Sequence, residues 1–228
     1  MEILLAAATG FEIQPTIDYL RNRTRDNRFV SVTPLITGVG PLATCYALTR
    51  GIDSAGPGLV IQAGIAGCLT GKKPGEVLAV SEEVLADVGV WEGQRFQSLF
   101  DMKLADPNAP PFSGGRLVNP HSGLLALTGL EPVRGMTVNE ITTDPTRIEW
   151  HQQNTFAVVE SMEGGSLHYV CLQAGVPFLQ LRAVSNAVGV RDKTKWNIPL
   201  AIARLNEELI VLLEKLENGL PINGIKTI

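Results

Sequence analysis

The sequence predicts one α/β domain, and three observations support this fold class. Apolar runs of strand length alternate along the chain with amphipathic segments of helical period, as in a sheet covered by helices. The chain has 228 residues and no linker rich in Pro, Gly or Ser divides it, so we expect a domain over residues 1–218 and a tail over 219–228. Polar residues repeatedly follow an apolar run directly, and such strand ends are where α/β proteins bind ligands.

The amino-acid composition limits the classes of partner that the protein is expected to bind. Charged residues make up 18% of the chain, the formal net charge is −4, and Lys and Arg form no runs, so we expect a small-molecule partner, with no nucleic acid and no membrane. The acidic N-terminal stretch and the lack of an apolar run of roughly 20 residues predict a cytoplasmic protein. Cys45, Cys68 and Cys171 form no Cys-x-x-Cys pattern and the histidines are scattered, so neither a disulfide framework nor a metal site is expected.

The first strand is predicted over residues 3–9, and a helix follows to about Arg21. Pro15 fits best near the first turn of that helix, which suggests a start beyond Gly10. Glu12 then has two interpretations. It forms a capping box with Thr9, or its carboxylate faces a ligand crevice at the end of the strand. The residues alone favour neither.

A second strand is predicted over residues 29–37, and Gly38-x-Gly40 opens a helix that we expect to end at Gly51. The glycine pair resembles a phosphate loop only weakly, and a tight turn is the simpler interpretation. A third strand over 58–63 leads into Gly64-Ile65-Ala66-Gly67, where small residues would let the backbone lie against a ligand.

The middle of the chain is less regular. A strand is predicted over residues 75–86 and another over 132–138, ending at Asn139, and a helix over 144–152 begins at Asp144-Pro145. The intervening segment 87–113 has four aromatic residues among Pro and Gly, which suits a surface cover, a substrate lid or a subunit interface. These aromatic residues are Trp91, Phe96, Phe100 and Phe112.

Two strand ends in the last third hold the most informative residues. A strand over 155–160 leads through Ser161-Met162-Glu163 into a helix over 162–174, and a last strand over 178–184 ends in Ser185-Asn186. We therefore expect Glu163 and Asn186 to share one crevice. A long helix follows, with an apolar stripe typical of a helix laid on a sheet. The stripe comprises Ile198, Ile202, Leu205, Leu209, Leu212 and Leu216.

These motifs resemble a known group of enzymes. Gly64-Ile65-Ala66-Gly67, Glu160-Ser161-Met162-Glu163-Gly164 and Arg182-Ala183-Val184-Ser185-Asn186 occur in the order typical of the nucleoside phosphorylase and nucleosidase superfamily. Ser161-Met162-Glu163-Gly164 together with Ser185-Asn186-x-Val188-Gly189-x-Arg191-Asp192 and Trp196 is most similar to the futalosine hydrolases of an alternative menaquinone pathway. The resemblance covers roughly residues 1–216. It implies a single-domain three-layer α/β/α fold with a mixed twisted sheet, and hydrolysis of futalosine to hypoxanthine and dehypoxanthine futalosine without metal or cofactor.

The resemblance also implies roles for individual residues. Glu12 matches the carboxylate that activates water, and Met162 with Glu163 matches the clamp on the ribose. Arg191 and Asp192 could order the loop behind Asn186, and Arg191 could assist the leaving base. The implied substrate-binding residues are Gly64, Ile65, Ala66, Val138, Asn139, Ser161, Met162, Glu163 and Arg191.

Asn186 stands where the adenine-releasing nucleosidases carry Asp. An amide offers an NH₂ donor for a 6-oxo group and a carbonyl acceptor for N7–H, so Asn186 favours hypoxanthine over adenine, and we count it with Glu12 as catalytic. The alternative is an Asn that merely ends a strand. Phosphorylases of the superfamily bind phosphate through Arg and a hydroxyl, whereas Glu12 and Ile65 occupy the matching loops here, which favours hydrolysis over phosphorolysis.

Several matters stay open at this point. The substrate could be another purine nucleoside, such as inosine, methylthioadenosine or S-adenosylhomocysteine, or the protein could bind nucleosides without turnover. The resemblance suggests a homodimer or a higher homo-oligomer in which a neighbouring subunit closes the site. Arg134 or Arg147 could pair the carboxylate at the benzoate end of futalosine, and the spacing favours neither.

Overall fold

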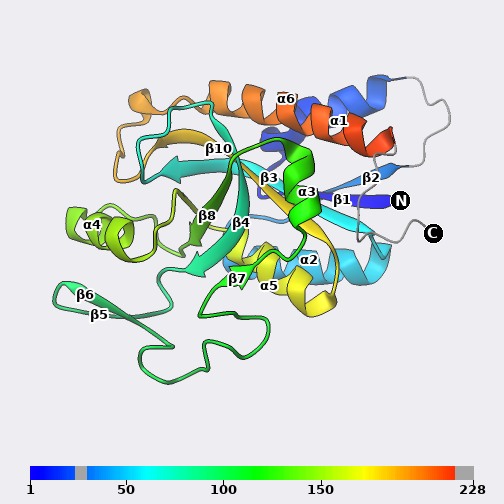
Figure 1. Cartoon of the computed structure of the whole chain (residues 1–228). Helices are drawn as coiled ribbons and strands as arrows, with labels where there is room; N and C mark the ends of the chain where they lie inside the picture. The colour runs from blue at the N-terminus through cyan, green and yellow to red at the C-terminus, as the bar shows by residue number, and fades with distance from the viewer. Residues whose placement is uncertain (24–29, 219–228) are drawn as a thin grey trace.

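A mixed sheet forms the centre of the molecule, and helices cover both of its faces (Figure 1). The computed structural model describes residues 1–23 and 30–218. The predicted tail over 219–228 and the predicted strand start at Phe29 lie outside these residues. The strand order is β10 (Phe178–Ala187), β4 (Val77–Leu85), β8 (Pro132–Thr137), β9 (Val159–Ser161), β3 (Leu59–Cys68), β1 (Glu2–Ala7) and β2 (Ser31–Ile36), and β7 (Leu117–Val118) pairs with β4.

Five of these strands close into a ring, because β10 pairs with β3 as well as with β4. Strand β10 runs parallel to β3 and antiparallel to β4, and β9 runs antiparallel to β3. The mixed, three-layer α/β/α fold implied by the sequence is thus confirmed. None of the helices in the described part of the chain is long and apolar enough to cross a membrane.

Two helix pairs make the outer layers (Figure 1). Helices α1 (Gly10–Asn22) and α6 (Ile198–Glu217) cover one face, and α2 (Pro41–Ala55) and α5 (Gly164–Ala174) cover the other. The predicted apolar stripe of α6 packs into the core through Leu205, Leu209, Leu212 and Leu216. The short α3 (Ser122–Thr128) joins the same core through Leu124. Neither α3 nor β7 was predicted.

The predicted end of α2 at Gly51 is wrong. The helix continues to Ala55 and ends at Gly56, whose φ of +55° is the left-handed conformation that glycine adopts easily. A Cβ on Gly51 would lie 3.0 Å from the Leu35 side chain and 3.1 Å from that of Leu4. Gly51 therefore serves close packing of the helix on β1 and β2 rather than helix termination.

The aromatic segment 87–113 is partly ordered into a hairpin of β5 (Gly89–Glu92) and β6 (Arg95–Ser98). Its Trp91 and Phe96 rings lie 5.5 and 5.6 Å from Trp150 of α4 (Pro145–Asn154). Helix α4 begins at Asp144 as predicted, since that carboxylate accepts hydrogen bonds from two first-turn amides. A 3₁₀ turn over Lys193–Lys195 precedes α6.

Candidate functional site

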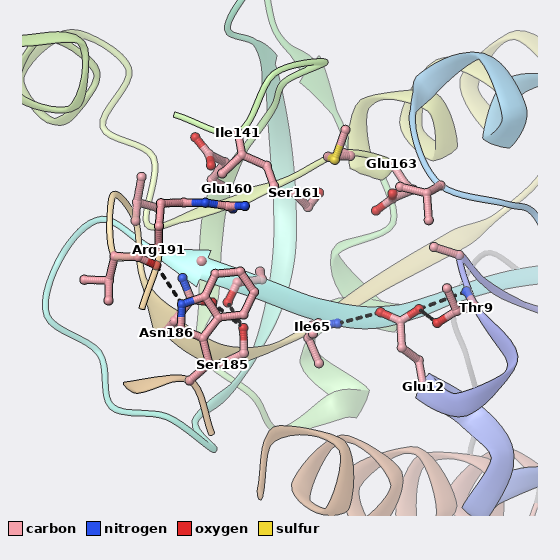
Figure 2. A pocket seen from close by; sticks show the side chains of 18 of the residues that line it. Thr9, Glu12, Ile65, Ile141, Glu160, Ser161, Glu163, Ser185, Asn186 and Arg191 are labelled. Atoms are coloured by element: carbon pink, nitrogen blue, oxygen red, sulfur yellow. Dashed lines mark hydrogen bonds between the residues drawn. The ribbon is translucent and has the colours of Figure 1, made fainter. Parts of the chain in front are cut away.

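The ends of several ring strands and of β1 surround a cavity of about 240 Å³ (Figure 2). This volume lies slightly below the range of roughly 300–1,000 Å³ that small-molecule sites occupy. Thr9, Glu12 and Glu163 lie at one end, and Glu160, Asn186 and Arg191 at the other (Figure 2). The expectation that Glu163 and Asn186 face one crevice is confirmed, although β3 separates their strands in the sheet.

Glu12 fits both interpretations given above, because its carboxylate caps helix α1 and also lines the cavity. Its Oε2 accepts hydrogen bonds from the backbone N–H of Thr9 at 3.0 Å and from its hydroxyl at 2.7 Å, which is the helix-capping role. Its Oε1 accepts from the N–H of Ile65 at 3.1 Å, and the side chain lines the cavity. Three of the roughly four acceptor positions of the carboxylate are occupied, so its orientation at the cavity wall is fixed.

The backbone around Glu12 is held by a distant side chain. Helix α1 starts at Gly10, so the prediction that Pro15 lies near the first turn is wrong; the proline sits inside the helix. The amide of Asn206 on α6 donates to the carbonyl oxygen of Glu12 at 2.9 Å and accepts from the N–H of Thr16 at 3.0 Å. Those two backbone groups pair with each other in an uninterrupted α-helix. Asn206 therefore satisfies the backbone where Pro15 interrupts it.

Glu163 is the N-cap residue of α5 and is almost completely buried. Its Oε1 accepts a hydrogen bond of 3.1 Å from the N–H of Gly40, and its Oε2 lies 3.5 Å from Nη1 of Arg182. Gly40 has φ +93°, which lets the turn aim its N–H at the carboxylate. The loop that weakly resembled a phosphate loop thus binds a side-chain carboxylate.

Arg182 is a charged residue beside the candidate site that sequence reasoning missed. It lies opposite Gly64 in the β10–β3 pairing, and a Cβ on Gly64 would collide with its Nη1. The space left by Gly64 is therefore filled by a guanidinium, which also donates to Oε1 of Gln62 at 2.8 Å. Polar residues at alternate positions of an apolar strand, Gln180 and Arg182, were the available signal.

A second buried carboxylate, Glu83 of β4, supports the start of α5 from inside the ring. It accepts hydrogen bonds from Gln180 at 2.8 Å and from the hydroxyl of Thr137 at 2.9 Å, and Thr137 in turn accepts from the N–H of Gly165 at 2.7 Å. Burial raises the pKa of Glu83 to about 7, against the lowering effect of these donors and of Arg182.

At the other end of the cavity a β-bulge orients Asn186. The register between β10 and β3 shifts between Val184 and Asn186, so Ser185 is the extra residue. The Ser185 hydroxyl lies within hydrogen-bonding distance of Oδ1 of Asn186 at 2.7 Å, and Nδ2 of Asn186 donates to the carbonyl of Ala187 at 2.9 Å. The Ala187 carbonyl can only accept, so this second contact fixes Nδ2 as the donor and Oδ1 as the acceptor of the amide. Arg191 stacks on Trp196 at 5.6 Å.

Not every predicted residue reaches the cavity. Glu12, Ile65, Ala66, Ser161, Met162, Glu163, Asn186 and Arg191 line it. Gly64 lies behind its wall, against Arg182 and Glu12. Val138 is buried in a separate apolar cluster, Asn139 is held by Asp87, and Ile141 lines the cavity instead. The structure therefore does not bring Val138 and Asn139 to this cavity.

The two arginines considered for a substrate carboxylate also lie outside the cavity lining. Arg134 binds Glu82 at 2.5 Å, and Arg147 stacks on Trp91 at 5.3 Å. The aromatic residues of segment 87–113 are likewise absent from the described lining, so this cavity does not assign them a lid role. Within residues 1–23 and 30–218, no three His, Cys, Asp or Glu side chains gather to hold a metal ion.

The family model described as "Phosphorylase superfamily" matches residues 16–216, and the chain belongs to this superfamily. It is 34% identical over 184 residues to a futalosine hydrolase of Acidothermus cellulolyticus, covering 78% of this chain and 73% of the relative. It is 32% identical over 195 residues to a futalosine hydrolase of Streptomyces coelicolor, covering 82% and 80%. Within the superfamily, these relatives group the chain with the futalosine hydrolase family.

Solved structures agree on the fold. A 5′-methylthioadenosine/S-adenosylhomocysteine nucleosidase of Colwellia psychrerythraea, solved with adenine, superposes with a TM-score of 0.79 at 18% identity, covering 95% of this chain and 96% of that one. At this identity the likeness concerns the fold and leaves the substrate open.

Proposed function

We propose that this protein hydrolyses the N-glycosidic bond of futalosine and releases hypoxanthine and dehypoxanthine futalosine. The observation that carries the proposal is one cavity with an oriented carboxylate, Glu12, at one end and an oriented amide, Asn186, at the other. The futalosine hydrolases among the relatives, at 31–34% identity, support the choice of substrate.

Glu12 would position and deprotonate the attacking water. The cleavage builds positive charge on the sugar, and water adds to the anomeric carbon as the bond to the purine nitrogen breaks. The water proton passes to Glu12, and the bonding electrons leave with the base, which takes up a proton from solvent to become neutral hypoxanthine. Because Thr9 and Ile65 hold three hydrogen bonds to the carboxylate, it needs little reorganisation at the moment of reaction.

Glu163 and Met162 would hold the ribose. A carboxylate accepts hydrogen bonds from sugar hydroxyls, and the thioether of Met162 offers an apolar surface to the ring. The N–H of Gly40 and the guanidinium of Arg182 fix Glu163 from two sides, so the clamp is built before the substrate arrives.

Asn186 would read the leaving base. Its Nδ2 suits the 6-oxo group and its Oδ1 suits a proton on N7, which is the pattern of hypoxanthine. The reverse pattern, adenine, would leave a polar group without a partner, at a cost of about 1–3 kcal/mol. This supports a 6-oxopurine nucleoside over methylthioadenosine.

Hydrolysis is favoured over phosphorolysis because two backbone N–H groups that could bind a phosphate already donate to carboxylates. The N–H of Ile65 and the N–H of Gly40 are both occupied by carboxylates, Glu12 and Glu163. A phosphate dianion would have to displace one of these carboxylates and would meet the negative charge of the other.

We further propose that the protein works as a homo-oligomer. Phe11 and Val39 are exposed and line the cavity. Leu42 and Tyr46, which follow Val39 in the first turns of α2, are 87% and 72% exposed. A second subunit placed over this surface would remove it from water and narrow the entrance. Light scattering coupled to size-exclusion chromatography measures the assembly directly.

We also propose that the reaction takes place in the cytoplasm. Cys45, Cys68 and Cys171 are free thiols. Free thiols without a disulfide framework suit a reducing compartment. Fractionation of cells that produce the protein at native level would test this placement.

The decisive assay uses the purified protein with futalosine, inosine and methylthioadenosine, each with and without phosphate, and chromatography of the released base and sugar. Release of hypoxanthine from futalosine, independent of phosphate, is the expected result. Adenine release would assign the protein to the methylthioadenosine nucleosidases instead, and a phosphate requirement would make it a phosphorylase. The absence of turnover with all three would refute the proposal.

A further inference from the structure

Glu83 and His168 are buried titratable residues that the proposed reaction does not use. Glu83 lies on β4, and His168 lies on α5, which packs on β4 and β7 (Figure 1). Their exposed fractions are 1% and 0%. The side chain of Gln180, on β10, contacts both of them. Buried polar groups cost free energy unless each has a hydrogen-bond partner, so the hydrogens of this cluster can be assigned by counting donors and acceptors.

The hydrogen bonds of His168 identify which ring nitrogen carries a hydrogen. Nδ1 lies 2.9 Å from the carbonyl oxygen of Leu117, which can only accept, so Nδ1 is the donor. Burial lowers the pKa of His168 to about 4, against the raising effect of Leu117 and Gln180, so the ring is neutral at pH 7. Nε2 of the neutral ring is therefore an acceptor, and it has no hydrogen-bond partner among the described residues.

The amide of Gln180 presents a second unpaired acceptor. Its Nε2 donates to Oε1 of Glu83 at 2.8 Å, an arrangement that suits an ionised carboxylate. Its Oε1 is buried and has no hydrogen-bond partner in the described part of the chain. With this orientation of the amide, its oxygen and Nε2 of His168 are both acceptors, so neither can satisfy the other.

A proton on Glu83 would give both acceptors a partner. The protonated carboxyl donates to the amide oxygen of Gln180, and the amide NH₂ then donates to Nε2 of His168. This requires only a half-turn of the amide, whose nitrogen and oxygen ends have nearly the same shape. The second oxygen of Glu83 still accepts from the hydroxyl of Thr137 at 2.9 Å. Hydrogen bonding therefore favours the protonated form of Glu83 independently of the cost of burying its charge.

The charge of Glu83 affects the candidate site because its carboxyl lies against the start of α5. A Cβ on Gly164, the residue that follows Glu163, would collide with Oε1 of Glu83. Burial raises the pKa of Glu83 most, and of the charged groups around it Arg182 lowers the pKa and Glu163 raises it. Strands β7 and β8 present only an uncharged carbonyl and an uncharged hydroxyl to this cluster. An ionised Glu83 would thus compete for Arg182 and repel Glu163.

We propose that Glu83 is protonated in the folded protein and hydrogen-bonds through Gln180 to His168, and that this neutral relay positions the ribose clamp. Arg182 then pairs with Glu163 without competition from a second buried carboxylate. Loss of the proton, as the pH rises, would divide the attraction of Arg182 between the two. Glu83 is a positioning residue, since it acts on the substrate only through Glu163, whose role as the clamp rests on the proposed function.

The test follows NMR signals of protein labelled with ¹³C at the Glu carboxyls and ¹⁵N in the His rings, from about pH 5 to about pH 9. The Glu83 carboxyl should titrate at about 7, and Nε2 of His168 should change in the same step, because the amide turns away while the ring stays neutral. The Glu163 carboxyl should respond in that step. His151 is the matched control, since it is also buried with a pKa of about 4, and its ring should not change near pH 7.

Glu83→Gln keeps the neutral relay, because its NH₂ can donate to Gln180 and its oxygen can accept from Thr137. In this variant the signals of His168 and Glu163 should stay constant through the same pH range. With futalosine as substrate, the KM of the wild type should rise by up to about tenfold between about pH 6 and pH 8, and that of Glu83→Gln should stay flat. A role in packing alone would change stability without linking KM to this proton.

A Glu83 carboxyl that titrates near its usual value of 4.5 overturns the proposal, and so does a His168 ring that does not respond when Glu83 titrates. Parallel KM profiles of the wild type and Glu83→Gln overturn the positioning role. If Glu83→Gln does not fold, the wild-type signals of His168 and Glu163 decide alone. Those signals need no substrate, so a protein without futalosine turnover would refute the proposed function, and the Glu163 signal would still decide whether Glu83 acts on it.

Discussion

The side chain of Asn206 donates a hydrogen bond of 2.9 Å to the carbonyl oxygen of Glu12, which lies 194 positions earlier in the chain. The same amide accepts from Thr16. We expect Asn206→Ala to lower the free energy of unfolding by about 2–4 kcal/mol, because buried backbone groups lose their partners. Turnover should fall as well, because the backbone that carries the Glu12 side chain loses its support. Urea unfolding and steady-state kinetics measure the two effects.

Asn154→Ala is the control for this substitution. Asn154 is exposed on α4, and its amide donates only to a carbonyl of its own helix, at 2.8 Å. Its removal should change the free energy of unfolding by less than about 0.5 kcal/mol. Equal effects of the two substitutions would contradict the role of Asn206.

Glu12→Gln should reduce turnover by about 10²–10⁴-fold, the usual contribution of a general base, while nucleoside binding is kept. The amide retains an acceptor for the N–H of Ile65 but cannot take a proton from water. Single-turnover kinetics and calorimetry separate the two effects. Asp18→Asn, on an exposed turn of the same helix, is the control. Full activity of Glu12→Gln would remove this residue from the mechanism.

Asn186→Asp should shift the preference from hypoxanthine toward adenine release. An ionised Asp has no NH₂ donor for the 6-oxo group, so the hypoxanthine nucleoside loses about 1–3 kcal/mol of transition-state binding. The adenine nucleoside loses less. The ratio of kcat/KM for inosine to that for adenosine reports the shift, and a ratio equal to that of the wild type would refute the role assigned to Asn186.

Arg182→Met should destabilise the fold by about 3–5 kcal/mol, because the buried carboxylate of Glu163 loses its cation. The substrate KM should rise in the same variant, since Glu163 is less firmly held. Arg204→Met breaks an exposed ion pair with Glu207 on α6 and should cost under about 1 kcal/mol. Similar losses in both variants would show that the Arg182 pair has no special role.

Glu83 should make stability depend on pH. Burial raises its pKa from 4.5 to about 7, so between these values the folded protein holds a proton that the unfolded chain releases. The contribution of Glu83 to the free energy of unfolding is therefore fully present below about pH 4.5 and is lost as the pH rises through 7. Glu83→Gln should remove on the order of 1–3 kcal/mol of that decline. Urea unfolding at pH 5 and pH 8 measures it, with the exposed Glu92→Gln as the control that keeps the wild-type slope.

Much of the fold could be predicted because the apolar runs of β1, β3 and β10 are strong local signals. The stripe of α6 was equally clear, since its apolar residues recur at the period of a helix. The ends of the helices could not be predicted as well. Gly51 resembles a helix stop in sequence, yet its role is set by Leu4 and Leu35 packing against it, which no local pattern reveals.

The candidate site likewise contains some residues that the sequence could predict and others that it could not. Glu163 and Asn186 follow apolar runs directly, so sequence position alone predicted that they share one cavity. Position left Glu12 open between a helix cap and a ligand-facing carboxylate, and the family resemblance was needed to favour the cavity. Arg182 was missed because its partners, Gly64 and Glu163, come from other elements and become neighbours only through strand pairing. Asn139 was expected at the cavity, but Ile141 lines it instead. Asp87 and Glu160 hold this loop in place through hydrogen bonds, and the local sequence does not reveal those contacts.

The ring of β10, β4, β8, β9 and β3 also limits where the protein can aggregate. Each of these strands is paired on both sides, so none presents a free row of backbone groups to another molecule. The sheet ends at β2, where Pro34 pairs with Leu5 of β1 and has no N–H to donate to an incoming strand. This free edge of the main sheet therefore carries its own block against intermolecular strand addition.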